Sequence, residues 1–168
     1  IAGINQDNVY SPDKVFLGEE TLPAGRVVIE GGGLVGCELA VYLCEEKGYA
    51  DVTVIEGAGE LMSGGFEPMP LPNKLMLIDL MKFHGVKVLT GAMLDHIDGD
   101  KVYVKRGGEV SALETDSVVM SIGFDANDGL YREICANVPK KVWLLGDAKM
   151  PSNIMFGVRD ANAIAREI

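Results

Sequence analysis

The stretch from residue 26 to residue 56 limits the fold of this chain more than any other stretch. Residues 26–29 form a short β-branched run that leads at once into glycines, which is typical of a buried strand feeding a tight turn. Good helix formers over residues 34–47 predict a helix that ends at Gly48, and residues 52–55 predict a second strand. Strand, helix and strand within about thirty residues make a βαβ unit, whose strands are parallel and whose crossover is right-handed.

The rest of the chain is consistent with an α/β fold. Abundant Gly, Pro and Met predict a loop over 57–72, and a broad apolar face predicts a helix over 75–84. Glycine-containing turns at 98–100 and 107–108 separate three short segments and predict an antiparallel β-meander. The other predicted elements are strands over 86–90, 93–97, 101–105, 110–113, 118–121 and 142–145, and a closing helix over 153–168. We therefore expect a parallel sheet with helices and an inserted antiparallel β-meander.

The acidic composition excludes several kinds of partner. A formal net charge of -10 and a pI near 4.6 oppose binding to nucleic acid phosphates and to anionic lipid. No run approaches the roughly 18 apolar residues of a membrane helix, so a cytoplasmic protein without membrane contact is expected. The three cysteines, Cys37, Cys44 and Cys135, contain no C-x-x-C pair. Only His84 and His96 could add imidazole ligands, so no metal site is expected.

The glycines after the first strand have the spacing G-x-G-x-x-G, and Glu56 follows at the end of the second strand. Gly31 permits the tight turn, Gly33 lets a diphosphate approach the backbone, and Gly36 lets helix and strand pack closely. The diphosphate would rest against unpaired N–H groups at the helix start, where the helix dipole favours an anion. The sequence therefore predicts a dinucleotide-binding site.

The choice of dinucleotide is predicted from Glu56, whose carboxylate would accept hydrogen bonds from the adenosine ribose hydroxyls. A 2′-phosphate would meet that carboxylate, and residues 57–60 provide no arginine to receive it. NAD(H) is therefore expected in preference to NADP(H). The residues expected to contact the dinucleotide here are Gly31, Gly32, Gly33, Leu34, Val35, Gly36, Glu56 and Gly57.

Two further acids flank the glycines. Glu38 is expected in the first turn of the helix, where the helix dipole stabilises any acid. Glu30 ends the first strand, where a carboxylate that pointed at a diphosphate would repel it. We therefore expect Glu30 to turn away from the diphosphate or to pair with a cation.

Residues 27–40, with the sequence VVIEGGGLVGCELA, resemble the NAD-binding fingerprint of the NADH:flavin oxidoreductases that include 2-enoate reductase and 2,4-dienoyl-CoA reductase. Residues 1–4, 116–123 and 145–168 resemble the linker that enters the NAD domain of those proteins, the strand that leaves it and the returning FAD segment. The resemblance implies a Rossmann-like FAD/NAD(P)-binding fold. The implied domains are a linker from a missing FAD-binding segment at 1–24, an NAD-binding domain at 25–124 and the returning FAD part at 125–168.

The resemblance also implies a function. NADH would be held so that hydride passes to FAD, and electrons would continue to an iron-sulfur cluster and FMN in a barrel domain of the parent chain. By position, Glu38 would lie near the nicotinamide, Gly123 would line the NAD cleft, and Gly146 with Asp147 would contact FAD. The implied partners are the missing N-terminal FAD segment and the flavin and iron-sulfur barrel domain. Because the first FAD glycine motif is absent, the isolated chain is expected to be inactive.

Two alternatives remain open at this stage. Glu30 beside the glycines is reminiscent of the acid-glycine turn of S-adenosylmethionine-dependent methyltransferases, although its spacing from the later glycines is poor. A non-catalytic NAD-sensing module would bind NADH equally well. No catalytic acid, base or nucleophile is predicted, which suits a domain whose cofactors carry out the chemistry.

Overall fold

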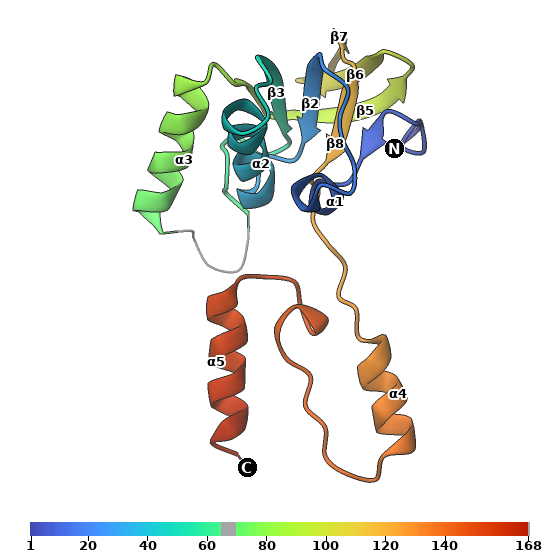
Figure 1. Ribbon diagram of the computed structural model, residues 1–168, viewed down its shortest axis with the longest axis vertical. Coiled ribbons are helices and arrows are strands. Elements are labelled where there is room, and N and C mark those ends of the chain that lie inside the picture. Colours follow the sequence, from blue (N-terminus) through green and yellow to red (C-terminus); the bar gives the residue numbers. More distant parts are fainter. Residues whose placement is uncertain (65–69, 168) are drawn as a thin grey trace. The chain divides into compact units, whose positions relative to one another are not determined.

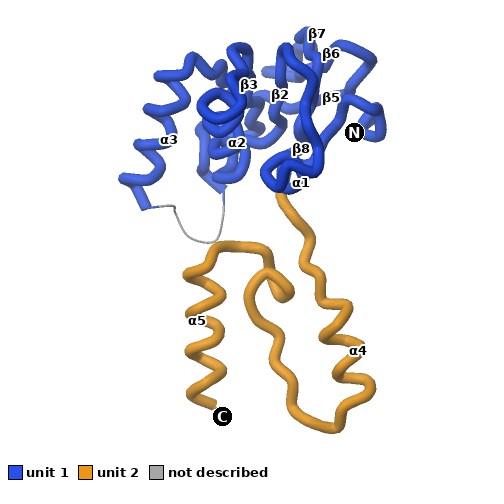
Figure 2. Tube along the Cα trace, viewed as in Figure 1, with its two compact units in different colours: residues 1–122 blue, residues 123–168 orange. Residues whose placement is uncertain are grey.

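The computed structural model describes residues 1–64 and 70–167, and the chain forms two compact units (Figure 1 and Figure 2). Unit 1 comprises residues 1–122 and unit 2 comprises residues 123–168. The expected α/β fold, with a parallel sheet and a separate antiparallel sheet, is confirmed. Among the described residues, no helix combines the length and the apolar character that crossing a membrane requires.

A five-stranded parallel sheet runs through unit 1 in the order β1-β8-β2-β3-β4. Its strands are β1 (Val9–Tyr10), β2 (Arg26–Glu30), β3 (Asp51–Glu56), β4 (Lys87–Thr90) and β8 (Ser117–Met120). Strands β2, β3 and β8 are largely buried on both faces, which explains their largely apolar sequences. Because the strands are parallel, the carboxyl ends of β2 and β3 lie together, with Glu30 opposite Ile55.

The described helices of unit 1 are α1 (Pro12–Leu17), α2 (Leu34–Glu45) and α3 (Leu71–Phe83). Helices α2 and α3 cover one face of the parallel sheet, where Ile29, Leu39 and Met81 belong to one buried core (Figure 1). Helix α3 begins four residues earlier than expected, because prolines favour the first positions of a helix. The end of the loop expected over 57–72 is therefore helical, and its residues 65–69 lie outside the described part of the chain.

The inserted antiparallel sheet covers the opposite face. Its strands pair in the order β5 (Ala92–Asp98), β6 (Lys101–Arg106) and β7 (Glu109–Glu114). Val28 of β2, Ile55 of β3 and Leu94 of β5 share a second buried core between the two sheets. The β-meander expected from the two glycine-containing turns is confirmed.

Residues 1–24, which the sequence suggested to be a linker, lie within unit 1. The N–H of Ile97 donates to the Ala2 carbonyl (3.0 Å), and the side chain of Gln6 donates to the Ile97 carbonyl (2.9 Å). Strand β1 also pairs with β8, so this stretch joins the parallel sheet to the first strand of the inserted sheet. Neither β1, with two residues, nor α1, with six, was expected, because elements this short show no clear periodicity.

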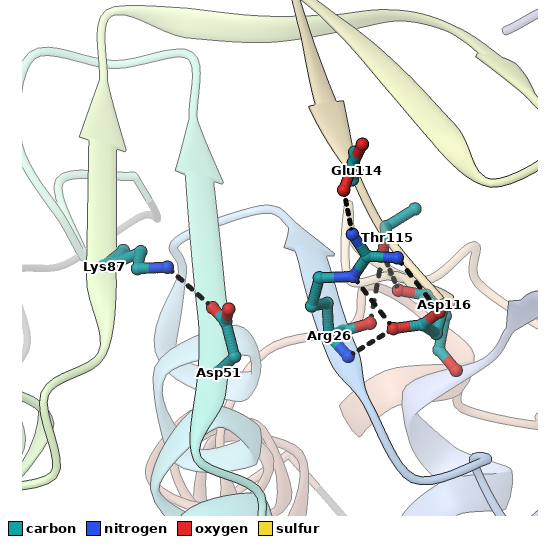
Figure 3. Close-up of polar contacts among 7 residues, drawn as sticks. Arg26, Asp51, Lys87, Glu114, Thr115 and Asp116 are labelled. Atoms are coloured by element: carbon teal, nitrogen blue, oxygen red, sulfur yellow. Dashed lines mark hydrogen bonds and ion pairs between the residues drawn. The ribbon is translucent and has the colours of Figure 1, made fainter.

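A charged cluster connects the inserted sheet to the edge where the parallel strands begin (Figure 3). Arg26 donates from Nε to Asp116 Oδ2 (3.0 Å) and from Nη2 to Asp116 Oδ1 (3.2 Å), and it also pairs with Glu114. These hydrogen bonds hold the pKa of Asp116 at about 2, below its usual range. At the same edge, Lys87 of β4 pairs with Asp51 of β3 (2.8 Å). The cluster therefore fixes the beginning of β2, at the opposite end of that strand from the glycines.

Unit 2 contains α4 (Gly129–Asn137), a 3-10 turn (Gly146–Ala148) and α5 (Ile154–Ala165). The helix expected over 153–168 is confirmed as α5, although residue 168 lies outside the described residues. Asn153 caps this helix, because its side-chain oxygen accepts a hydrogen bond from the Phe156 N–H (3.2 Å).

The prediction of a strand over 142–145 is wrong, because these residues have no regular structure. A strand needs neighbouring strands, and the described residues of unit 2 contain none. Helix α4 was not expected, and an ion pair between Arg132 and Asp128 (2.8 Å) supports its start. Neither α4 nor α5 has a buried residue, and Leu130 and Ile154 are 70% and 87% exposed. Unit 2 therefore presents its apolar side chains on its own surface.

Candidate functional site

The glycine loop connects β2 to α2 at the carboxyl edge of the parallel sheet. Gly31 has a φ of 106° and donates from its N–H to the Ile55 carbonyl (2.8 Å). A Cβ on Gly31 would lie 2.2 Å from the Ser121 carbonyl oxygen, and one on Gly36 would lie 1.9 Å from the Gly31 carbonyl oxygen. A Cβ on Gly33 would meet no atom within 4 Å. Two glycines are thus required by the fold, while the space before Gly33 is open to a ligand.

Helix α2 begins without a side-chain cap. Gly33 is its N-cap residue, and no described side chain accepts a hydrogen bond from the first turn. The first N–H groups of any helix lack intrahelical partners, and the helix dipole places partial positive charge there. Leu34 is 39% exposed and Val35 is partly exposed, so this end of the helix is accessible. The geometry fits the diphosphate of a dinucleotide.

The carboxylate of Glu56 lies beside the glycine loop at the end of β3. Its Oε2 accepts a hydrogen bond from the Gly32 N–H (2.8 Å), and its Oε1 accepts one from the Ala58 N–H (2.7 Å). These bonds fix the carboxylate, and each oxygen keeps a second lone pair that can accept a ribose hydroxyl. Gly57 follows directly, where a Cβ would lie 3.3 Å from Met93 Cγ. The structure thus brings together the expected residues of unit 1 at one edge of the sheet.

Glu30 turns away from the open side of the glycine loop, which is the first of the two alternatives expected for it, and no described cation pairs with it. The residue is 7% exposed and turns toward the inserted sheet, where its Oε1 accepts a hydrogen bond from the Leu94 N–H (3.3 Å). Within the described residues, its buried Oε2 has no hydrogen-bond partner. Burial raises the pKa of the Glu30 carboxyl to about 7, and the negative charge of Glu56 acts in the same direction. Glu30 is therefore a buried acid behind the glycine loop.

Glu38 is not in the first turn of α2, contrary to expectation. The helix begins at Leu34, and its first turn contains no acid, because one turn takes 3.6 residues and Glu38 is the fifth. Its side chain is exposed. The helix dipole therefore does not account for Glu38, and its position near a nicotinamide stays a prediction.

The remaining expected residues belong to unit 2 and are described within it. Gly123 has a φ of 109° and Gly146 a φ of 61°, conformations that favour glycine. Asp147 Oδ1 accepts a hydrogen bond from the Ser152 N–H (3.1 Å), which closes the turn before α5. The residues described in either unit include no group of three or more potential metal ligands.

Sequence reasoning missed one part of the site, the loop after Glu56. Leu61 and Met62 are 9% and 6% exposed, and the Met62 N–H donates to the Gly32 carbonyl (2.8 Å). The available signal was the apolar pair of Leu61 and Met62 within a glycine-rich stretch. Such a pattern does not show the direction of the Met62 N–H.

Comparison with known proteins places the chain among pyridine nucleotide enzymes. The model of the pyridine nucleotide-disulphide oxidoreductase family matches residues 2–156. Cinnamate reductase of Clostridium sporogenes is 33% identical over 162 residues, which are 96% of this chain and 24% of that protein. A solved structure of 2-naphthoyl-CoA reductase is 25% identical with a TM-score of 0.86, over 100% of this chain and 24% of that chain. An FAD-dependent pyridine nucleotide-disulphide oxidoreductase from Desulfovibrio vulgaris is 28% identical with a TM-score of 0.60, over 79% of this chain and 34% of that chain.

The chain therefore spans 24% of the length of the cinnamate reductase that it matches. The family resemblance inferred from residues 27–40 is confirmed by these matches, and so is the FAD/NAD(P)-binding fold. The glycine loop, the uncapped helix and the acid at the next strand end are typical of dinucleotide-binding folds. The chain belongs to the pyridine nucleotide-disulphide oxidoreductase family and is part of an oxidoreductase.

Proposed function

We propose that unit 1 binds NADH and positions it for hydride transfer to FAD in a larger flavin-dependent oxidoreductase. The observation that carries the proposal is the Glu56 carboxylate, held 2.8 Å from the Gly32 N–H beside the uncapped start of α2. When bound, the nicotinamide supplies the hydride, and the protein binds and orients it. In this arrangement the amides of α2 hold the diphosphate and Glu56 holds the adenosine ribose.

The same geometry favours NADH over NADPH. A 2′-phosphate on the ribose would face the Glu56 carboxylate, and like charges repel strongly at such short range. Residues 57–60 contain no cation, and Glu60 pairs with the nearby Lys74 (3.5 Å), which reduces the positive charge available to a phosphate. The ribose end of the site is therefore acidic.

We expect calorimetric titration to show at least about a tenfold tighter Kd for NADH than for NADPH, a difference of about 1.4 kcal/mol. The Glu56→Gln variant should lose most of this preference, because it removes the repelling charge. A side-chain amide also cannot accept hydrogen bonds from both Gly32 and Ala58. Binding of NADH should therefore weaken as well.

Glu109→Gln is the matched control for this experiment, since Glu109 is an exposed acid on β7 and its replacement changes the net charge equally. The control should keep both affinities. Equal binding of NADH and NADPH by the unaltered chain, or binding of neither, would contradict the proposed function.

We also propose partners for the chain within a longer protein. The exposed apolar side chains of α4 and α5 suit packing against a further FAD-binding segment, which would complete the flavin site that Gly146 and Asp147 begin. By family resemblance, the parent would continue to a barrel domain with FMN and an iron-sulfur cluster.

The isolated chain should then fail to oxidise NADH with added FAD above background, whereas the intact parent does so. Efficient turnover by the isolated chain would contradict this part of the proposal.

The methyltransferase alternative has lost its support, because the acid on which it depended, Glu30, bonds to β5 and not to the open side of the glycine loop. Family membership also favours a pyridine nucleotide. A non-catalytic NAD-sensing module stays open, and turnover by the intact protein separates it from the enzyme. The cytoplasmic location stays a prediction.

A further inference from the structure

Three hydrogen bonds hold the backbone of Gly32, the middle residue of the glycine loop. Its N–H donates to Glu56 Oε2 (2.8 Å), while its carbonyl accepts from the Met62 N–H (2.8 Å) and from the Cys37 thiol (3.5 Å). The Cys37 side chain is fully buried, and burial raises the pKa of its thiol to about 12, so the thiol keeps its proton and remains a donor. The residue between Gly31 and Gly33 is thus held on both its N–H and its carbonyl side.

Met62 makes its hydrogen bond from an unusual backbone conformation. With a φ of 52°, it is the one non-glycine residue with a positive φ among residues 1–64 and 70–167. A side chain with a Cβ disfavours this left-handed region, and such conformations persist where the surroundings impose them. Here the surroundings are the buried side chains of Met62 and Leu61, which belong to the same core as α2 and α3.

Leu61 and Met62 lie directly against the glycine loop. Leu61 lies against Gly32, since a Cβ on Gly32 would come 2.5 Å from Leu61 Cδ2. The Met62 N–H points to the Gly32 carbonyl, and the positive φ sets the direction in which the buried Met62 side chain leaves this bonded N–H. A binding loop that is fixed before the ligand arrives loses less entropy on binding, which increases affinity.

We propose that Met62 is a positioning residue of the dinucleotide site. Its left-handed conformation lets its side chain stay buried while its N–H bonds to the Gly32 carbonyl, and this bond fixes the open Gly33 amide at the start of α2. The inference rests on the proposed binding of NADH. Met62 does not touch the dinucleotide in this arrangement, and its effect is transmitted through the glycine loop.

The test compares Met62→Gly with Met62→Ala. Both variants delete the buried side chain, but glycine adopts a positive φ freely whereas alanine disfavours it. Met62→Ala should therefore bind NADH about fivefold more weakly than Met62→Gly. Calorimetry measures the Kd, and differential scanning fluorimetry measures Tm, which should fall in both variants.

Leu77→Ala is the matched control, because Leu77 is a buried side chain on α3 with the same 6% exposure as Met62. Its Tm should fall while its Kd for NADH stays within about twofold, as expected for lost packing alone. Equal affinities of Met62→Gly and Met62→Ala would overturn the positioning role while NADH binding by the unaltered chain still supports the proposed function. Failure of the unaltered chain to bind NADH would overturn both.

Discussion

Replacing Gly36 with alanine is expected to reduce NADH affinity at least about a hundredfold, equivalent to about 2.7 kcal/mol. The added Cβ would lie 1.9 Å from the Gly31 carbonyl oxygen and 3.1 Å from the Gly31 carbonyl carbon. Both are backbone atoms, so no side-chain rotation can relieve the overlap, and α2 must move away from β2. The displacement would move the helix amides from the diphosphate and would lower the free energy of unfolding by about 1–3 kcal/mol.

Gly33→Ala is the informative comparison for Gly36→Ala. Its Cβ would meet no protein atom within 4 Å, so the free energy of unfolding should change by no more than about 0.5 kcal/mol. NADH binding should still weaken, because the new methyl group would occupy the space in which the proposed site receives the diphosphate. Urea denaturation and calorimetry separate the two effects. A Gly36→Ala protein with unaltered stability and NADH affinity would contradict the packing that the structure shows.

Replacing Glu30 with glutamine is expected to stabilise the protein at pH 8 by about 3 kcal/mol. Burial raises the pKa of the Glu30 carboxyl from 4.5 to about 7, so the folded chain holds a proton that the unfolded chain has released. Stability should consequently fall as the pH rises from about 4.5 to about 7, and the loss should be complete above this range. Glutamine carries no charge and can still accept the Leu94 hydrogen bond, so this pH dependence should disappear in the variant.

The measurement for Glu30→Gln is the free energy of unfolding by urea at several pH values from 4.5 to 8. Near pH 4.5 the variant and the unaltered chain should have similar stability, because the Glu30 carboxyl is protonated in the folded state. Glu46→Gln, at the exposed acid directly after α2, serves as the control and should leave the pH profile unchanged. An unchanged slope in Glu30→Gln would show that the carboxyl is ionised and solvated in the folded protein.

Local sequence signals were sufficient for much of the fold. The parallel strands β2, β3 and β8 were predicted because strands buried on both faces must be largely apolar over their whole length. The meander was predicted because glycines mark its turns. Contact between Glu56 and the glycine loop could also be anticipated, although the residues are 24 positions apart, because a βαβ unit places successive strand ends together.

The errors concern elements whose stability depends on distant partners. Residues 142–145 have the composition of a strand, but a strand forms only where another strand offers hydrogen bonds, and unit 2 offers none among its described residues. Helix α4 spans only nine residues and begins with glycine, a poor helix former, so local helix propensity did not mark it. Composition alone could not decide either case.

The sequence by itself determined the βαβ unit, the antiparallel meander inserted into the chain and the position of the glycine loop. These features follow from short-range backbone sterics and from hydrophobic periodicity. Tertiary structure alone decided that Glu30 is a buried acid bonded to Leu94, 64 residues away, and that Met62 supports Gly32. The physical reason is that burial, hydrogen-bond partners and pKa depend on which segments meet in space, and these contacts form only when both sheets and the helices pack together.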